Sequence, residues 1–235
     1  MLLQYILSHL PKNKKHMNRQ IIVAERKGMF IVFEGIDGSG KSTQIELFAR
    51  GLKTLDKYNE YLFAREQTYR AKEIRASLKN DQDAFSSGER MAEFYIKDRE
   101  EHMNELILPV LKARRFVLCD RYKLSTYAYQ AVQGVPLEKL EEMHKQRGII
   151  NPDLTFFINT PADVAVSRLQ SRGEHIEKFE QLDFQKELSD KYKELVRYAQ
   201  SHPDFAGKVF SVNGENSPET VASLIFGIFC SFYRS

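Results

Sequence analysis

The chain has no tryptophan, only two cysteines and no long apolar run. Two cysteines, Cys119 and Cys230, cannot build a disulfide framework, and they lack the C-x-x-C spacing of a metal or redox site. No run approaches the roughly 18 apolar residues of a membrane helix, and the six histidines have no metal-ligand spacing. We therefore expect a cytoplasmic protein that does not bind membranes.

A net positive charge is also lacking, except at the N-terminus. Residues 1–28 hold six basic residues and one acid, so they carry +5, which leaves −2 for the other 207 residues because the total is +3. A body without basic excess argues against binding of nucleic acid. We expect residues 1–28 to be a loosely ordered basic extension of a single domain over residues 29–235. The alternatives are an organelle-targeting peptide, because the segment is poor in acids, or translation from Met17 or Met29.

From residue 29 onward, short apolar runs alternate with helix-like segments. The runs suit strands buried on both faces of a sheet, and they cover residues 29–33, 61–64, 116–119, 154–158 and 208–212. The helix-like segments cover residues 44–55, 86–115, 124–132, 137–147, 161–171, 182–200 and 218–233. Pro109 predicts a kink, and Thr160 is the expected N-cap before Pro161. The pattern predicts an α/β fold with a five-stranded parallel sheet and helices on both faces.

One motif dominates the sequence. Residues 35–42 fit G-x-x-x-x-G-K-[ST], the P-loop pattern, and they lie between an apolar run and a helix-like segment as that motif requires. Its glycines let backbone N–H groups surround an anion, Lys41 would reach the β- and γ-phosphates, and Ser42 would hold Mg²⁺. The expected ATP-binding residues are Gly35, Ile36, Asp37, Gly38, Ser39, Gly40, Lys41, Ser42 and Thr43.

A second candidate pair follows the third apolar run. Asp120 directly follows four apolar residues, which is the arrangement of a Walker B acid near Mg²⁺. We expect Asp120 to act on the ion from the second coordination shell. Arg121 comes directly after it, and its guanidinium can bind a phosphate through two hydrogen bonds. A surface ion pair is the alternative interpretation.

These motifs together resemble the thymidylate kinase family, members of the P-loop nucleoside monophosphate kinases. Phe33 to Thr43 is similar to that family's signature, and residues 120–130 resemble its D-R-[YH]-x-x-S-x-x-A-Y-Q motif. Pro152-Asp153-Leu154 resembles its P-D-L strand entry, and the similarity runs from about Met29 to the C-terminus. The resemblance implies ATP as phosphoryl donor, Mg²⁺ as cofactor, a short lid at about residues 172–180 and a homodimer.

By the same resemblance, Arg65 and Arg121 would bind the phosphate of the acceptor monophosphate, and Asp37 would contact the acceptor side. Tyr95, at a position that is more often Phe, would stack on the base, and Arg99 would bind the base edge. Tyr129 would crowd the 2′ position and favour deoxyribose. The complete acceptor set is Asp37, Arg65, Tyr95, Arg99, Arg121, Thr126, Tyr129 and Gln130.

The family places a catalytic arginine either in the P-loop or in the lid. The variable loop positions here are Asp37, Gly38 and Ser39, so the chain resembles the lid-arginine type. Arg168 and Arg172 are four residues apart and share a helix face. Lys178 stands where many relatives have Arg. The expected catalytic residues are Lys41, Asp37, Arg121, Arg168 and Arg172.

One segment departs from the family pattern. Relatives read R-E-P-G-G after the second strand, whereas this chain has Arg65-Glu66-Gln67-Thr68-Tyr69. The expected activity is ATP-dependent phosphorylation of dTMP to dTDP, and the changed loop leaves dUMP or dGMP as alternative acceptors. A GTPase-like switch or an inactive nucleotide-binding regulator is the alternative from another class. Against the switch, no N-K-x-D motif follows the P-loop.

Overall fold

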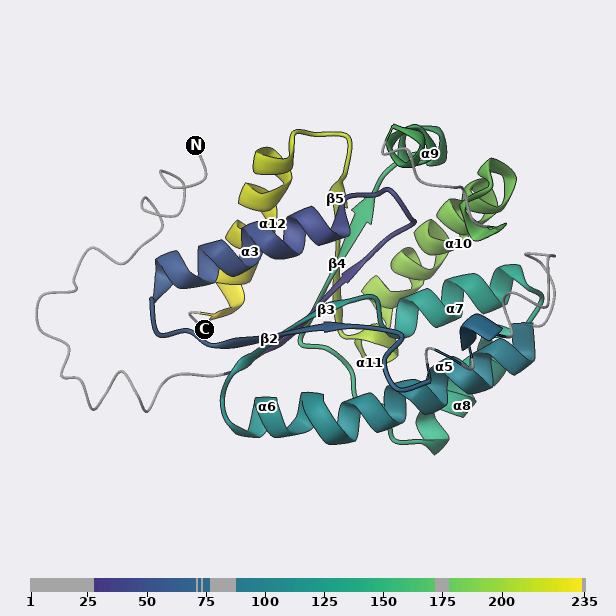
Figure 1. Ribbon diagram of the computed structural model, residues 1–235, viewed down its shortest axis with the longest axis horizontal. Coiled ribbons are helices and arrows are strands. Elements are labelled where there is room, and N and C mark those ends of the chain that lie inside the picture. The colour runs from purple at the N-terminus through teal and green to yellow at the C-terminus, as the bar shows by residue number, and fades with distance from the viewer. Residues whose placement is uncertain (1–27, 71, 73, 77–87, 172–177, 234–235) are drawn as a thin grey trace, which may run out of the picture.

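The computed structural model describes residues 28–70, 72, 74–76, 88–171 and 178–233. Within them a parallel sheet has the strand order β2-β3-β1-β4-β5 (Figure 1). Its strands are β1 (Phe30–Glu34), β2 (Tyr61–Arg65), β3 (Phe116–Asp120), β4 (Leu154–Asn159) and β5 (Lys208–Asn213). The strand order reverses on either side of β1, and in such sheets ligands bind beyond the strand ends at that point. The predicted fold class and its five strands are confirmed.

Helices cover both faces of the sheet, as predicted. One face packs against α3 (Lys41–Leu55) and α12 (Pro218–Tyr233). The other face lies beneath a larger layer of helices (Figure 1). That layer comprises α5 (Gly88–His102), α6 (Leu108–Lys112), α7 (Lys123–Val132), α8 (Leu137–Gln146), α9 (Ala162–Gln170), α10 (Leu182–Ser201) and α11 (Pro203–Ala206). Among the described helices, none is long and apolar enough to cross a membrane.

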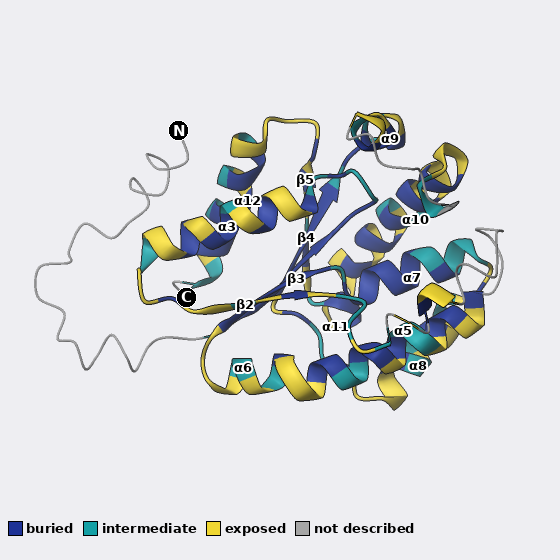
Figure 2. Cartoon of the chain, in the orientation of Figure 1, coloured by how far each residue is buried: buried dark blue, intermediate teal, exposed yellow. Residues whose placement is uncertain are grey.

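The buried strands explain the apolar runs of the sequence. All five residues of β1 are buried, and so are all five of β3 (Figure 2). Successive side chains point to opposite faces, so Ile31 and Phe33 join the core beneath α3 while Phe30 and Val32 join the other core. The sheet thus divides two hydrophobic cores and places its polar strand ends at one edge.

Two local predictions need correction. The helix expected over residues 86–115 is interrupted by a π-helical turn at Met103–Ile107, ahead of Pro109, which lies in the first turn of α6. Proline has no N–H and its ring crowds the carbonyl four residues earlier, so a wider turn before it is favoured. Thr160 is not an N-cap: α9 begins at Ala162 without a side-chain cap, and the Thr160 hydroxyl donates to Ser39 O at 3.2 Å.

Some predictions fall on residues that the structure leaves undescribed. These are the extension up to residue 27, the first two residues of the helix expected over residues 86–115, and the lid segment 172–177 with Arg172. Only Lys178–Glu180 of the predicted lid is described, as a 3₁₀ turn before α10.

Candidate active site

The P-loop joins the end of β1 to the start of α3. Gly35, Gly38 and Gly40 have φ of 145°, 80° and 100°, a region that side chains disfavour. At Gly38 a Cβ would also lie 2.2 Å from Ala165 O, so only glycine fits there. The Ser39 N–H donates to Ile36 O at 3.2 Å and closes the turn. Backbone shape alone therefore requires glycine at this point.

The first turn of α3 is open to an anion. Its N-cap, Gly40, has no side chain that could accept from the N-terminal N–H groups. The first N–H group that donates within the helix is that of Gln44, which donates to Gly40 O at 3.1 Å. The preceding N–H groups carry the partial positive charge of a helix N-terminus. A phosphate is the kind of group that this arrangement binds.

Lys41 lies within the loop that precedes it. Its Nζ donates to Gly35 O at 3.0 Å and to Ile36 O at 2.9 Å, and the residue is only 7% exposed. Burial and the nearby Arg121 lower the pKa of Lys41 to about 8, although Asp37 and Asp120 oppose the shift. The ammonium is thus held beside the loop and is charged at neutral pH.

Asp120 ends β3 and is 2% exposed. Its Oδ2 lies 3.6 Å from Nε of Arg65, whose side chain is 70% exposed, and its Oδ1 has no hydrogen-bond partner among the described residues. A buried carboxylate oxygen without a partner fits a cation or a cation-bound water. Ser42 is exposed in the first turn of α3. The described ranges contain no group of three or more His, Cys, Asp or Glu that could hold a metal ion.

Arg121 is held by groups from three elements. Its backbone is left-handed, with φ of 69°, which is rare outside glycine and clusters at functional sites. Nη2 donates to Asp37 Oδ1 at 2.5 Å, while Nη1 donates to Ser125 Oγ at 3.2 Å and to Tyr192 Oη at 3.3 Å. Its guanidinium is therefore fixed beside the P-loop before any ligand binds.

Asp37 belongs to the P-loop and also lines a cavity beside Arg121. Its Oδ2 accepts from Tyr129 Oη at 2.8 Å, and its Oδ1 accepts from Arg121. Burial alone would raise the pKa of Asp37, but the positive charges of Arg121 and Lys41 and the Tyr129 hydrogen bond hold it well below its usual range. The carboxylate thus stays ionised.

Glu34 organises this region, and sequence reasoning missed it. It is fully buried, and its Oε1 accepts from the N–H groups of Tyr122 at 2.8 Å and Ser125 at 3.2 Å. Its Oε2 accepts from Ser125 Oγ at 2.6 Å and from Tyr192 Oη at 3.1 Å. A buried carboxylate needs such donors, so an acid inside an apolar strand was the signal that could have identified it.

A cavity of about 320 Å³ opens beside Arg121. It brings together every residue of the predicted acceptor set, from Asp37 and Arg65 to Gln130, and adds Glu66, Gln67, Ser125, Phe179 and Glu180. Phe179 and Glu180 come from the described end of the predicted lid. Residues from five separate stretches of sequence therefore line one cavity that is open to solvent, as a binding site for a small molecule requires.

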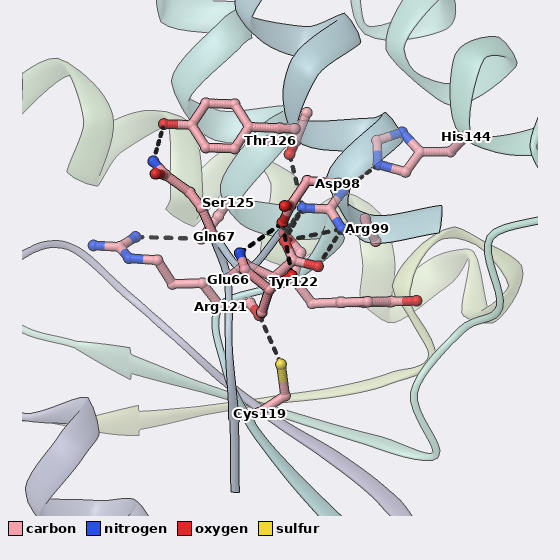
Figure 3. A network of polar contacts seen from close by, with 12 residues as sticks. Glu66, Gln67, Asp98, Arg99, Cys119, Arg121, Tyr122, Ser125, Thr126 and His144 are labelled. Atoms are coloured by element: carbon pink, nitrogen blue, oxygen red, sulfur yellow. Dashed lines mark hydrogen bonds and ion pairs between the residues drawn. The ribbon is translucent and has the colours of Figure 1, made fainter. Parts of the chain in front are cut away.

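Arg99 lines this cavity, and Figure 3 shows its polar contacts. It is 1% exposed, and it pairs with Glu66 through Nε at 2.8 Å and Nη2 at 2.5 Å. Nη2 also donates to Thr126 Oγ1 at 2.9 Å, and Nη1 lies 2.5 Å from His144 Nε2. Burial lowers the pKa of His144 well below its usual value, so the neutral ring accepts from Arg99. Glu66 and His144 were not foreseen, because their roles arise only from the packing of α5 and α8.

Arg168 lies at a different place from the acceptor cavity. Its Nη2 donates to Gly214 O at 3.0 Å, and it lines a second cavity of about 180 Å³ with Gly38, Ser39 and Gly40 of the P-loop. That cavity adjoins the phosphate-binding loop on the side of α12. Arg172, predicted to act with Arg168, lies outside the described residues.

Comparison with known proteins gives a consistent family. A family model described as thymidylate kinase matches residues 33–225. A thymidylate kinase of Wolbachia pipientis is 39% identical over 172 residues, which cover 72% of this chain and 81% of the relative. One of Kosmotoga olearia is 38% identical, with 72% and 82% covered. A probable thymidylate kinase of Thermococcus gammatolerans is 32% identical over 209 residues, with 86% and 95% covered.

Proposed function

Because this chain belongs to the thymidylate kinase family and phosphorylates dTMP to dTDP with ATP, we propose which side chains bind each nucleotide and assist transfer. The P-loop, residues 35–43, holds the ATP phosphates with Lys41 as counter-ion. Ser42 would hold Mg²⁺, and Asp120, whose Oδ1 has no partner among the described residues, would support the ion from the second coordination shell. Mg²⁺ would neutralise charge on the phosphates.

The acceptor base is selected by one donor and one acceptor. Gln130 Oε1 is buried in the described structure without a partner, and its Nε2 is held by Gln133 Oε1 at 3.0 Å. Arg99 offers a remaining N–H on Nη1, which has only His144 as a described partner. Thymine O4 accepts and N3–H donates, so the pair Arg99 and Gln130 matches it. Cytosine has the reverse pattern, and this complementarity is the observation that carries the proposal for the base.

The phosphate and the sugar of dTMP bind at the other end of the acceptor cavity. Arg121 and Arg65 bind the phosphate of dTMP, and Asp37 with Tyr129 contacts the sugar. Tyr129 would crowd a 2′-hydroxyl, which favours deoxyribose. The moving phosphoryl group passes between Lys41 and Arg121, whose charges stabilise it without a covalent enzyme intermediate.

The test is an acceptor panel. Purified protein with ATP and Mg²⁺ receives dTMP, dUMP, dCMP or dGMP at equal concentration, and ADP release is measured. We expect dTMP to be used best and dCMP to be at least about 100-fold poorer in kcat/KM, because it leaves Arg99 and Gln130 unpaired. Guanine presents the same two groups as thymine, so dGMP tests cavity size. No ADP with dTMP would overturn the proposed function.

The ionisation of Lys41 predicts a dependence on pH. Its pKa is lowered to about 8, so free enzyme loses this positive charge as pH rises through 8. We expect kcat/KM for ATP to fall above about pH 8, whereas kcat should fall less, since bound phosphates raise the pKa of the ammonium. Initial rates from pH 6.5 to about 9.5 check this. A flat profile of kcat/KM would contradict it.

Arg172 of the lid and Arg168 of α9 should affect different kinetic constants. Replacing Arg172 by alanine should lower kcat by roughly 100-fold and raise KM far less, because the arginine acts on charge that develops during transfer. Arg168→Ala should instead raise KM for ATP, since Arg168 adjoins the P-loop cavity. Steady-state kinetics on both variants check this, and equal effects on KM and kcat in both would contradict the assignment.

The rival classes are less well supported. An inactive regulator would have no need of Lys41, Asp120 and Arg121 gathered around one loop. A GTPase-like switch would leave the acceptor cavity, which Arg99 and Gln130 line, without a role. We also propose a homodimer and a cytoplasmic location, which sedimentation and cell imaging would test.

A further inference from the structure

The loop after β2 carries a polar side chain where the family pattern has proline. Gln67 lines the acceptor cavity, and its Nε2 donates to Tyr95 Oη at 3.0 Å. Tyr95 itself stands where the family more often has phenylalanine. Both departures therefore meet in one hydrogen bond on the cavity wall, which an apolar proline and phenylalanine could not form.

This loop is held firmly despite the loss of proline and glycines. Asp98 on α5 accepts from Thr68 N at 2.9 Å, from Thr68 Oγ1 at 3.2 Å and from Arg70 N at 2.6 Å. Arg70 Nη2 also pairs with Glu101 Oε1 at 2.5 Å. Two turns of α5 thus fix the backbone on the C-terminal side of Gln67, so its side chain has a defined position in the cavity.

The orientation of the base brings one ring position toward Gln67. In a pyrimidine, N3 and C5 lie on opposite sides of C4 and its oxygen. With N3–H at Gln130 of α7 and O4 at Arg99, C5 is turned away from Gln130. Gln67 adjoins Glu66, which contacts Arg99 through Nε and Nη2. The substituent on C5 therefore meets the wall formed by Gln67 and Tyr95.

The hydroxyl of Tyr95 is available as a donor at this wall. It already accepts from Gln67, and within the described part of the chain its own proton has no acceptor, so it can donate to a ligand. Burial raises the pKa of Tyr95 to about 12, so the proton stays in place at neutral pH. A methyl group on C5 can fill this space, but it leaves the donor unpaired, whereas a hydroxyl-bearing group can accept from it.

We propose that Gln67 and Tyr95 are specificity-determining residues that admit 2′-deoxyuridine 5′-monophosphates with a hydroxyl-bearing substituent at C5 alongside dTMP. The inference rests on the proposed placement of the acceptor. The reaction is unchanged: the terminal phosphoryl of ATP moves to an oxygen of the acceptor's 5′-phosphate and ADP leaves. The C5 substituent takes no part in bond making.

The test compares dTMP with 5-hydroxymethyl-dUMP as acceptors at saturating ATP and Mg²⁺. Enzymes to be measured are the unchanged protein, Tyr95→Phe, Gln67→Met, the double variant and Tyr69→Phe as control. Tyr69 lies in the same loop but is 47% exposed and outside the cavity lining. Thermal unfolding shows whether each variant folds. If Gln67→Met does not fold, the inference is tested by Tyr95→Phe, which removes one oxygen atom.

We expect the unchanged protein to use both acceptors with kcat/KM values within about fivefold. The ratio of kcat/KM for 5-hydroxymethyl-dUMP to that for dTMP should fall about tenfold in Tyr95→Phe, the effect of one hydrogen bond to the ligand. It should fall by a smaller factor in Gln67→Met, which removes the contact that orients the Tyr95 hydroxyl, and no further in the double variant than in Tyr95→Phe. Equal losses on both acceptors would mean a structural role and would overturn the inference. A protein that phosphorylates neither would overturn the proposed function as well.

Discussion

Replacement of Arg121 by alanine should lower kcat with dTMP by at least about 1,000-fold and leave the Kd for ATP within about threefold. The guanidinium is fixed by Asp37, Ser125 and Tyr192 before ligands bind, so its charge needs no rearrangement when the phosphoryl group moves. Such a preorganised cation in a site sheltered from water acts mainly on the transition state. The acceptor phosphate also loses its ligand, so KM for dTMP should rise.

The measurement combines steady-state kinetics with calorimetric titration of a non-hydrolysable ATP analogue. Arg115→Ala is the matched control, because Arg115 lies just before β3 and its side chain is 54% exposed, paired with Glu60. Arg121 lies just after the same strand, at its opposite end. The control should keep kcat within about twofold. If the Arg121 variant lost affinity for ATP as strongly as it lost turnover, its assignment to the acceptor and transfer side would be wrong.

Replacement of Lys41 by methionine should raise KM for ATP by more than about 100-fold and lower kcat by about 1,000-fold, because one charge serves both ground and transition states. Methionine keeps the length of the side chain and can occupy the same space. It cannot donate to Gly35 O and Ile36 O, so the loop also loses two hydrogen bonds. The variant therefore separates the charge of Lys41 from its packing.

Lys53→Met supplies the control for this variant. Lys53 lies in the last turn of the same helix, α3. Its Nζ makes an exposed contact with Lys57 O at 3.5 Å and lies 5.9 Å from the centre of the Tyr61 ring. Its replacement should leave the kinetics unchanged. Calorimetry with dTMP should give the unaltered affinity for both variants, since Lys41 does not line the acceptor cavity. An ATP affinity that survives in Lys41→Met would contradict the proposed donor site.

The sequence predicted the strands well, for a physical reason. Strands such as Phe30–Glu34 and Phe116–Asp120 are buried on both faces, so they read as unbroken apolar runs whose ends are plain. The helix is interrupted at Met103–Ile107, ahead of the kink that was predicted at Pro109. A single proline shows that a helix is disturbed, but it does not show which residues form the wider π-helical turn. The short helix Pro203–Ala206 was missed because so few residues carry no periodic signal.

The candidate site was predictable only where a motif or a family pattern named its residues. Gly35 to Thr43 has a spacing that is informative by itself, and the acceptor set came from the resemblance. The supporting residues could not be found this way. His144 touches Arg99 across 45 positions of sequence, and Tyr192 meets Glu34 across 158, so only the packed helices reveal them. Thr160 was assigned to the helix after it because local capping rules ignore a distant carbonyl such as Ser39 O.

Glu34 has one consequence for the order of events. It directly precedes the P-loop, and its carboxylate holds the backbone N–H groups of Tyr122 and Ser125, which follow Arg121. The donor and acceptor sites are therefore both attached to the buried Glu34 carboxylate, which keeps the distance between them constant. Neither nucleotide has to assemble the other's site on arrival, so we expect either one to add first, with random-order kinetics.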